Sequence, residues 1–301
     1  MGSRLGRMVS KVSHFYDLPW VYQILYGNRY FDTAMEAYSL AHILNANAKL
    51  LPLKNLDVLE LFAGHVSLEE RLRPLLPGGA IKKYATTDGY VGEGPVDVYA
   101  KGTKMRDFHL VLAPFFSINA TMPYDGPLTY GILADFFYRI ARNARALYIH
   151  FEPYPSVAYL SSICNCERWS QKAPPVLSVP SPIIPLENDG EWSLSYVLDT
   201  KWDRSHAAIV SHYPKGVDVM HGKEVVERIQ VKVPTVRTYW SESELFRALS
   251  DAGFNHIVFA NGSQQPLDGN ESDFDVSVLP TEYQDEDSDF RPANSILAIR
   301  K

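Results

Sequence analysis

The sequence has little cysteine, no long hydrophobic run and no excess of positive charge. Its two cysteines, Cys164 and Cys166, stand too close together for an ordinary disulfide, and no zinc-binding spacing surrounds them. No apolar stretch approaches the ~20 residues of a transmembrane helix, and none follows the basic N-terminal residues as in a signal peptide. The formal charge of −6 disfavours nucleic acid, because phosphate contacts need clustered Lys and Arg. We expect a reduced, cytoplasmic protein that binds neither nucleic acid nor membrane and holds no metal.

The 301 residues, 46% of them hydrophobic, are enough to bury a sizeable core. An apolar run over 58–61 predicts a short buried strand with Glu60 near its end, and a helix is predicted over 66–76. Between them lies a tight turn: Phe62, Ala63, Gly64 and His65. A strand, a tight turn and a helix open the nucleotide site of a doubly wound sheet, where the turn lets the backbone approach the ligand. The same pattern also occurs at plain strand-to-helix turns, so both interpretations stay open at this point.

A second strand is predicted over 82–87, and it ends at Asp88 and Gly89. A carboxylate at this place can accept both hydroxyls of a ribose, although Asp-Gly is also a common turn. Residues 96–100 predict a third strand. The run 108–113 is apolar throughout, as a central parallel strand buried on both faces requires.

The rest of the chain alternates between helical and strand patterns. A helix is predicted over 128–143 and a strand over 146–151, before a proline-rich loop that runs to about residue 189. From residue 191 the polarity period changes to two, which predicts antiparallel strands. Ser241 and Glu244 form a capping box, and Gly253 ends that helix. Strands over 255–260 and 294–300 close the chain.

Two segments resemble class I S-adenosylmethionine-dependent methyltransferases. Residues 60–64 resemble motif I, and residues 107–119 resemble motif IV of the small-molecule members. The resemblance implies an α/β fold: a Rossmann-like doubly wound sheet of about seven strands, with an antiparallel β insertion covering the substrate side. It also implies a division into an N-terminal lid segment and helix (1–50), a core (51–155 and 236–301) and the insertion (156–235).

The resemblance further implies S-adenosylmethionine as cofactor and a small molecule as methyl acceptor at O, N or C. Cofactor contacts fall on Tyr16, Tyr26, Arg29, Glu60, Phe62, Ala63, Gly64, His65, Asp88, Gly89, Thr103, Ala113, Pro114 and Phe115. Substrate contacts fall on Phe116, Asn119, Arg237 and Tyr239. The aromatic N-terminal residues either form a lid or dock the first helix, and both roles can coexist. The candidate bases are His65 and His150, each of which is also explained as a structural or solvated histidine.

Three positions depart from the family pattern. Val66 stands where a second glycine is usual, 101–104 contain no acid for the adenine, and His109 replaces an aspartate. These departures favour an alternative function as a catalytically inactive partner subunit or binding protein. A Rossmann dehydrogenase is a weaker third interpretation, because the full glycine fingerprint is missing. The oligomeric state, homodimer or partner subunit, stays open.

Overall fold

The computed structural model describes most of the chain in two compact units. The described residues are 8–12, 17–26, 33–63, 67–87, 107–115, 117–119, 128–152, 154–155, 157–164, 168–173, 176–177, 179–188, 190–260 and 294–301. Unit 1 comprises 1–30, 125–127 and 155–237, and unit 2 comprises 31–124, 128–154 and 238–301. Within the described ranges, no helix combines the length and the apolar character that crossing a membrane requires.

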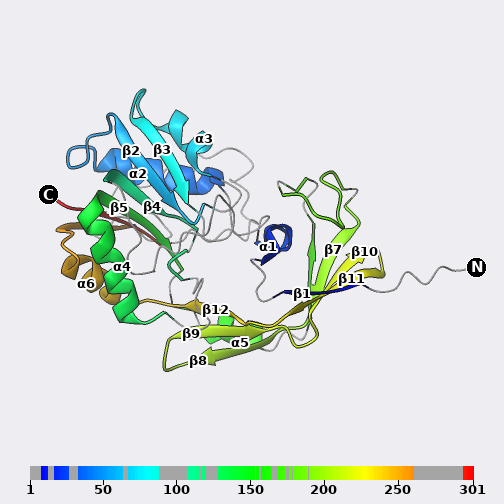
Figure 1. The fold of residues 1–301 in the computed structure, drawn as a ribbon. Helices are drawn as coiled ribbons and strands as arrows, with labels where there is room; N and C mark the ends of the chain where they lie inside the picture. Colours follow the sequence, from blue (N-terminus) through cyan, green and yellow to red (C-terminus); the bar gives the residue numbers. More distant parts are fainter. Residues whose placement is uncertain are drawn as a thin grey trace, which may run out of the picture. The chain divides into compact units, whose positions relative to one another are not determined.

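Unit 2 is built on a six-stranded sheet in the order β13-β14-β5-β4-β2-β3 (Figure 1). The strands are β2 (Leu56–Leu61), β3 (Ile81–Thr87), β4 (Phe108–Ala113), β5 (Ala144–Phe151), β13 (His256–Ala260) and β14 (Asn294–Ile299). The strands β3, β2, β4 and β5 are mutually parallel, whereas β14 runs antiparallel to both β5 and β13. The predicted α/β fold with a Rossmann-like sheet is confirmed, and the strand predicted over 96–100 lies outside the described residues.

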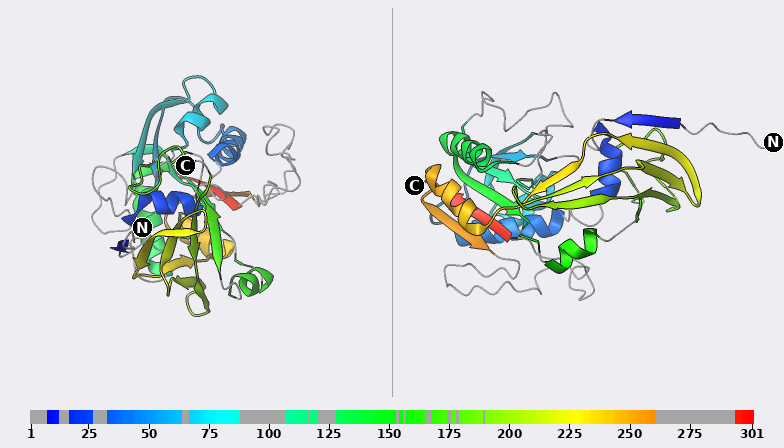
Figure 2. Two further views of the ribbon diagram at one scale, coloured as in Figure 1. Left: turned by 90° about the vertical axis from the view of Figure 1, so that its right-hand side faces the viewer. Right: turned by 90° about the horizontal axis from the view of Figure 1, so that it is seen from below.

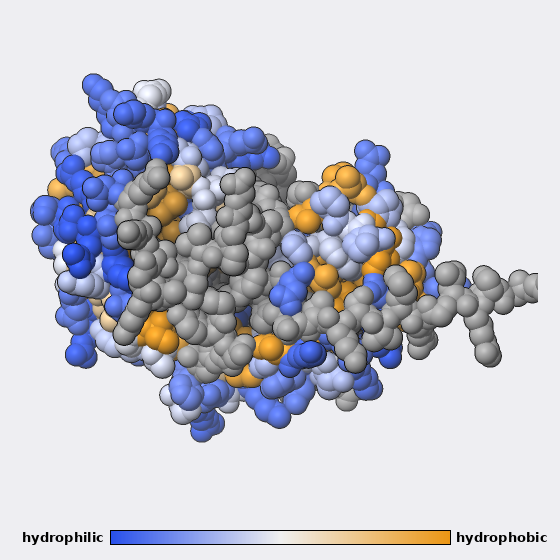
Figure 3. Space-filling model, in the orientation of Figure 1, coloured by the Kyte–Doolittle hydropathy of each residue, from blue (hydrophilic) through white to orange (hydrophobic). Residues whose placement is uncertain are grey.

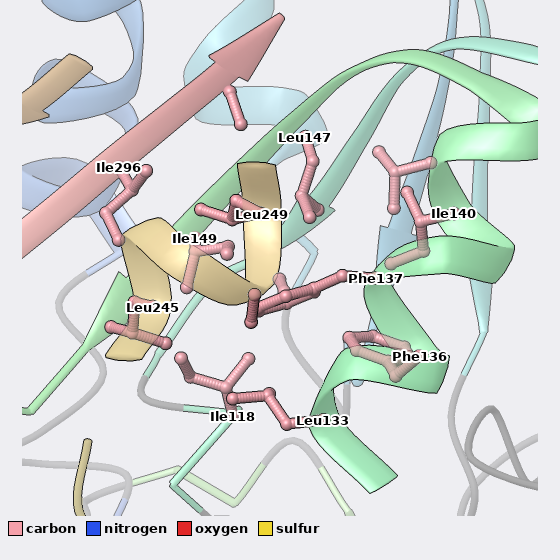
Figure 4. Close-up of a cluster of buried hydrophobic side chains, with 14 of the residues drawn as sticks. Ile118, Leu133, Phe136, Phe137, Ile140, Leu147, Ile149, Leu245, Leu249 and Ile296 are labelled. Atoms are coloured by element: carbon pink, nitrogen blue, oxygen red, sulfur yellow. The ribbon is translucent and has the colours of Figure 1, made fainter. Parts of the chain in front are cut away.

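Helices cover both faces of this sheet, as the apolar central strand predicted (Figures 1 and 2). On one face, Leu110 and Leu112 of β4 pack in a cluster that includes α2 (Thr33–Ala46) and α3 (Glu69–Leu72). On the other face, Val111 and Ala113 pack in a cluster with α4 (Tyr130–Asn143) and α6 (Glu242–Asp251). Figure 4 shows the second cluster, in which Phe137 of α4 points toward α6, the helix that carries Leu245 and Leu249. Alternate residues of one strand therefore serve two cores.

The helix predicted over 66–76 is shorter in the structure. Its described part consists of α3 and a single 3₁₀ turn, η2 (Arg73–Leu75). Pro74 accounts for this, because proline has no backbone N–H to donate and its ring clashes with the preceding helical turn. Arg73 stabilises the region by binding Glu69 and the carbonyl of Ile81.

Unit 1 contains two further sheets. The first has the order β1-β11-β10-β7-β6, and the second has the order β12-β9-β8. Their bounds are β1 (Met8–Val12), β6 (Trp169–Lys172), β7 (Trp192–Tyr196), β8 (Asp199–Asp203), β9 (Ala208–His212), β10 (Val217–His221), β11 (Glu224–Val231) and β12 (Thr235–Thr238). The antiparallel strands predicted after residue 191 are present.

A separate core holds unit 1 together. Trp20 and Ile24 of α1 (Pro19–Tyr26) belong to one buried cluster with Leu194, Val219 and Ile229 of the five-stranded sheet. The sequence did not predict β1, β6 or α5 (Val157–Cys164). Both α5 and β6 lie in the segment expected to be a loop, but they precede its dense prolines. On the face drawn in Figure 3, the described surface of unit 2 is mainly hydrophilic.

Candidate functional site

Two sharp backbone turns mark the carboxyl ends of neighbouring parallel strands in unit 2. Phe62 follows β2 with a φ of 58°, and Phe115 follows β4 with a φ of 55°. Positive φ is uncommon for a residue with a Cβ and costs ~1–3 kcal/mol, and such residues concentrate at functional sites. Next to Phe62, the N–H of Ala63 donates to the carbonyl of Thr87 at the end of β3. This bond ties the ends of β2 and β3 together at the carboxyl edge of the sheet, where open α/β sheets bind ligands.

Glu60 is fully buried beneath the first turn and holds it in place. Its carboxylate accepts hydrogen bonds from Ser67 Oγ (2.9 Å), the N–H of Leu68 (3.1 Å) and the Tyr84 hydroxyl (2.7 Å). Burial raises the pKa of Glu60, and these hydrogen bonds offset part of that rise. The resemblance implied a cofactor contact for Glu60. In the structure its oxygens bind two donors that follow the turn, Ser67 and Leu68, and one donor from β3, Tyr84.

The loop that follows β4 is fixed from two directions through Asn119. The Asn119 carboxamide donates to the carbonyls of Thr238 (2.9 Å) and Glu152 (3.2 Å), and it accepts from the N–H of Glu152 (2.8 Å). The backbone N–H of Thr238 donates in turn to the carbonyl of Asn119, and Trp240 Nε1 donates to that of Ile118. The loop is therefore joined to the end of β5 and to the segment that enters α6. These hydrogen bonds hold the loop that continues from Phe115 in one arrangement.

A buried acid and a buried imidazole meet near the end of β5. His150 Nδ1 forms an ion-pair contact with Glu36 Oε2, and both residues are buried. Beside them the Tyr148 hydroxyl shares a 3.0 Å hydrogen bond with Ser295 Oγ. Burial raises the pKa of Tyr148, and the charge of Glu36 raises it further, so this phenol stays protonated.

The remaining predicted site residues are distributed as follows. Ala113 and Pro114 precede Phe115 at the end of β4, and Tyr239 is buried just before α6. Arg237 is half-buried in β12, in the part of the chain assigned to unit 1, and Tyr26 is the last residue of α1. Several of the predicted residues lie outside the described residues: Tyr16, Arg29, Gly64, His65, Asp88, Gly89, Thr103 and Phe116. Of the predicted residues that the structure describes, Phe62 and Ala63 follow β2, Pro114, Phe115 and Asn119 follow β4, and His150 lies near the end of β5.

Sequence reasoning missed the residues that support this edge: Glu36, Tyr84, Tyr148, Thr238 and Ser295. Two of them carried a recognisable signal. Glu36 precedes Leu40 by four positions, so an acid occupies the apolar face of its helix. Tyr148 and His150 alternate with Leu147 and Ile149, which places two polar side chains on one face of a buried strand. A charged or polar residue at a core position usually has a specific partner.

Comparison with known proteins identifies the fold. No protein-family model matches the chain, and no curated protein matches it in sequence. Among solved structures, an S-adenosylmethionine-dependent methyltransferase from Clostridium acetobutylicum ATCC 824 superposes with a TM-score of 0.55 at 12% identity, covering 92% of this chain and 95% of that one. DesVI from Streptomyces venezuelae gives a TM-score of 0.50 at 13% identity, covering 93% and 97%. The chain thus has the fold of S-adenosylmethionine-dependent methyltransferases over nearly its whole length.

Proposed function

We propose that the chain is an S-adenosylmethionine-dependent methyltransferase that methylates a small molecule in the cytoplasm. The observation that carries this proposal is the pair of turns at Phe62 and Phe115, which follow adjacent parallel strands at the ligand-binding edge of a methyltransferase fold. Both turns bring backbone, rather than long polar side chains, to the edge. This suits a ligand that is bound closely along the ends of the strands.

The residues at this edge fit such a cofactor. Ala63 is the small residue directly after the first turn, and Ala113 and Pro114 precede the second turn, whose Phe115 packs in the core on the α2 face. Asp88 follows β3 in sequence and is proposed to accept the ribose hydroxyls. Glu60 would act indirectly by holding the turn, because three protein donors already bind its carboxylate. When bound, S-adenosylmethionine supplies a methyl group that is activated by the sulfonium charge.

The protein's part in the reaction is mainly positional. Methyl transfer is a direct displacement, so the chain must align the donor with the nucleophile and keep water away. Asn119 serves this purpose by fixing the loop after β4. Phe116, Arg237 and Tyr239 are proposed to contact the methyl acceptor, and His65 and His150 are the candidate bases.

A second candidate is a catalytically inactive protein with the same fold that serves as a partner subunit. Val66 and the missing acid in 101–104 favour it, because both changes affect positions that contact the cofactor in the family that the chain resembles. The two candidates differ in one measurable property, which is the affinity for the cofactor.

Calorimetric titration with S-adenosylmethionine and S-adenosylhomocysteine tests the proposal. We expect micromolar binding, and we expect Asp88→Ala to weaken it ~10-fold or more through loss of a charge-assisted pair. Asp107→Ala is the matched control, because Asp107 is exposed at the start of β4 and should leave the affinity unchanged. No binding at millimolar ligand by the folded protein would exclude the methyltransferase and favour the inactive subunit.

A further inference from the structure

The Glu36–His150 pair has features that the cofactor site alone does not explain. Glu36 is 5% exposed and His150 is 8% exposed, yet both are ionisable and lie between α2 and β5. They contact each other through Glu36 Oε2 and His150 Nδ1. The Tyr148 hydroxyl also approaches the Glu36 carboxylate, whereas the oxygen Glu36 Oε1 is buried and accepts no hydrogen bond from any described residue. A buried carboxylate oxygen without a donor is unfavourable, and such an oxygen suits a ligand that brings a donor to it.

The pair lies at the ligand-binding edge of the sheet. His150 is the penultimate residue of β5. Two positions further on, the N–H of Glu152 donates a hydrogen bond to Asn119 Oδ1. Glu36 belongs to the first turn of α2 and contacts His150 near the end of β5. The N-terminal end of α2 therefore lies at the carboxyl ends of the parallel strands. The opposite end confirms this direction, because Asn47, just beyond α2, contacts His256 at the start of β13. Glu36 and His150 are thus close to the same edge as Phe62 and Phe115.

Two further ionisable side chains of the described residues are coupled to Glu36. They are Glu60 from β2 and Tyr148 from β5, the strand that also carries His150. Burial raises the pKa of Glu60, and the nearby charge of Glu36 contributes to the same rise. Burial and the charge of Glu60 raise the pKa of Tyr84, so both tyrosines remain neutral. A buried Glu36 carboxylate with one oxygen left without a donor favours a cation over an uncharged ligand.

We propose that Glu36 and His150 receive the amino group of the methyl acceptor, so that the acceptor is an amine that arrives as an ammonium ion. This inference rests on the proposed methyltransferase function. Glu36 attracts the ammonium through Oε1 and orients His150 through Oε2. The imidazole of His150 then takes one proton from the ammonium, which frees the nitrogen lone pair, and the carboxylate of Glu36 neutralises the resulting imidazolium.

The proton and electron balance is complete with these two residues and the sulfonium donor. The nitrogen lone pair forms the new bond to the methyl carbon, while the carbon–sulfur bond breaks and its electron pair stays on sulfur. The product is a methylated ammonium and a neutral thioether, and the proton released beforehand remains on His150. Carbon acceptors and uncharged hydroxyl acceptors would not use the negative charge of Glu36.

The test uses n-propylamine and 1-propanol as probes of equal size on the full chain saturated with S-adenosylhomocysteine. The readout is the NMR signal of the His150 imidazole in histidine-labelled protein, which is identified by its loss in His150→Gln. We expect n-propylamine to shift this signal with saturation at millimolar concentration. The affinity for 1-propanol should be at least ~10-fold lower, and Glu36→Gln should lower the affinity for n-propylamine by ~10-fold or more. Glu70→Gln, an exposed acid in α3, is the matched control and should change nothing.

The proposal is overturned if n-propylamine leaves the His150 signal unchanged. It is also overturned if 1-propanol shifts the signal of the native protein as strongly as n-propylamine does, or if n-propylamine acts equally on Glu36→Gln and on the native protein. Thermal melting of Glu36→Gln establishes that the variant is folded. Calorimetry with S-adenosylhomocysteine on the same samples separates the two proposals. If S-adenosylhomocysteine binds but n-propylamine does not shift the His150 signal, only the amine site is contradicted. If n-propylamine shifts the signal but S-adenosylhomocysteine does not bind, the proposed methyl transfer is contradicted.

Discussion

Asn119 shows how one buried side chain can join three segments of the chain that are distant in sequence. Its side chain is 1% exposed and makes three hydrogen bonds to the backbone of Glu152 and Thr238. The sequence placed Asn119 correctly in the loop after the central strand, but it could not reveal those partners. They come from residues that are distant in sequence, and only the folded sheet brings them together.

The cost of removing this side chain should be large. We expect Asn119→Ala to lower the free energy of unfolding by ~2–4 kcal/mol, because it leaves buried N–H and C=O groups of Glu152 and Thr238 unsatisfied. Urea denaturation measures this loss. Asn143→Ala is the matched control, since Asn143 is half-buried and makes one bond to Arg139, and its loss should stay below ~1 kcal/mol. Equal losses for the two variants would contradict a structural role for Asn119.

Among the secondary-structure elements, those with a strong local signature were predicted best. The capping box at Ser241 and Glu244 is present, with both reciprocal hydrogen bonds, at the start of α6. The central strand β4 was recognised by its apolar run. In contrast, β1 pairs with β11, which is remote in sequence, and its five residues carry no pattern of their own. Such elements form because a partner is available, and a single sequence does not contain that information.

The capping box allows a quantitative prediction for α6. We expect Ser241→Ala to lower the free energy of unfolding by ~1 kcal/mol, because the N–H of Glu244 loses the acceptor that the serine hydroxyl provides. Ser250→Ala in the same helix is the matched control. Ser250 is exposed, and alanine has the higher helix propensity, so stability should be unchanged or slightly higher. Chemical denaturation of both variants provides the measurement. A larger loss for Ser250→Ala than for Ser241→Ala would be inconsistent with this account.

At the scale of the whole molecule, the last strand in sequence occupies an interior position. β14 lies between β5 and β13, and its residues 295–299 are all buried. Ile296 belongs to the core on the α4 and α6 face, while Leu297 and Ile299 belong to the core on the α2 face. The C-terminal residues therefore complete both cores of unit 2. The sequence predicted this strand, but its place within the sheet follows from pairing that no local pattern specifies.

Removal of residues 294–301 should therefore unfold unit 2. Burial of Ile296, Leu297 and Ile299 alone contributes ~5–9 kcal/mol, which is comparable with the ~5–15 kcal/mol that typically separates a folded domain from its unfolded state. The buried cluster of unit 1 contains no residue of β14, so hydrogen exchange should still show protection at Val217, Val219 and Ile229. Deletion of Lys301 alone is the control, because it removes one hydrogen bond to Asn255. Retention of protected amides in β2, β4 and β5 after the longer deletion would show that the sheet does not depend on β14.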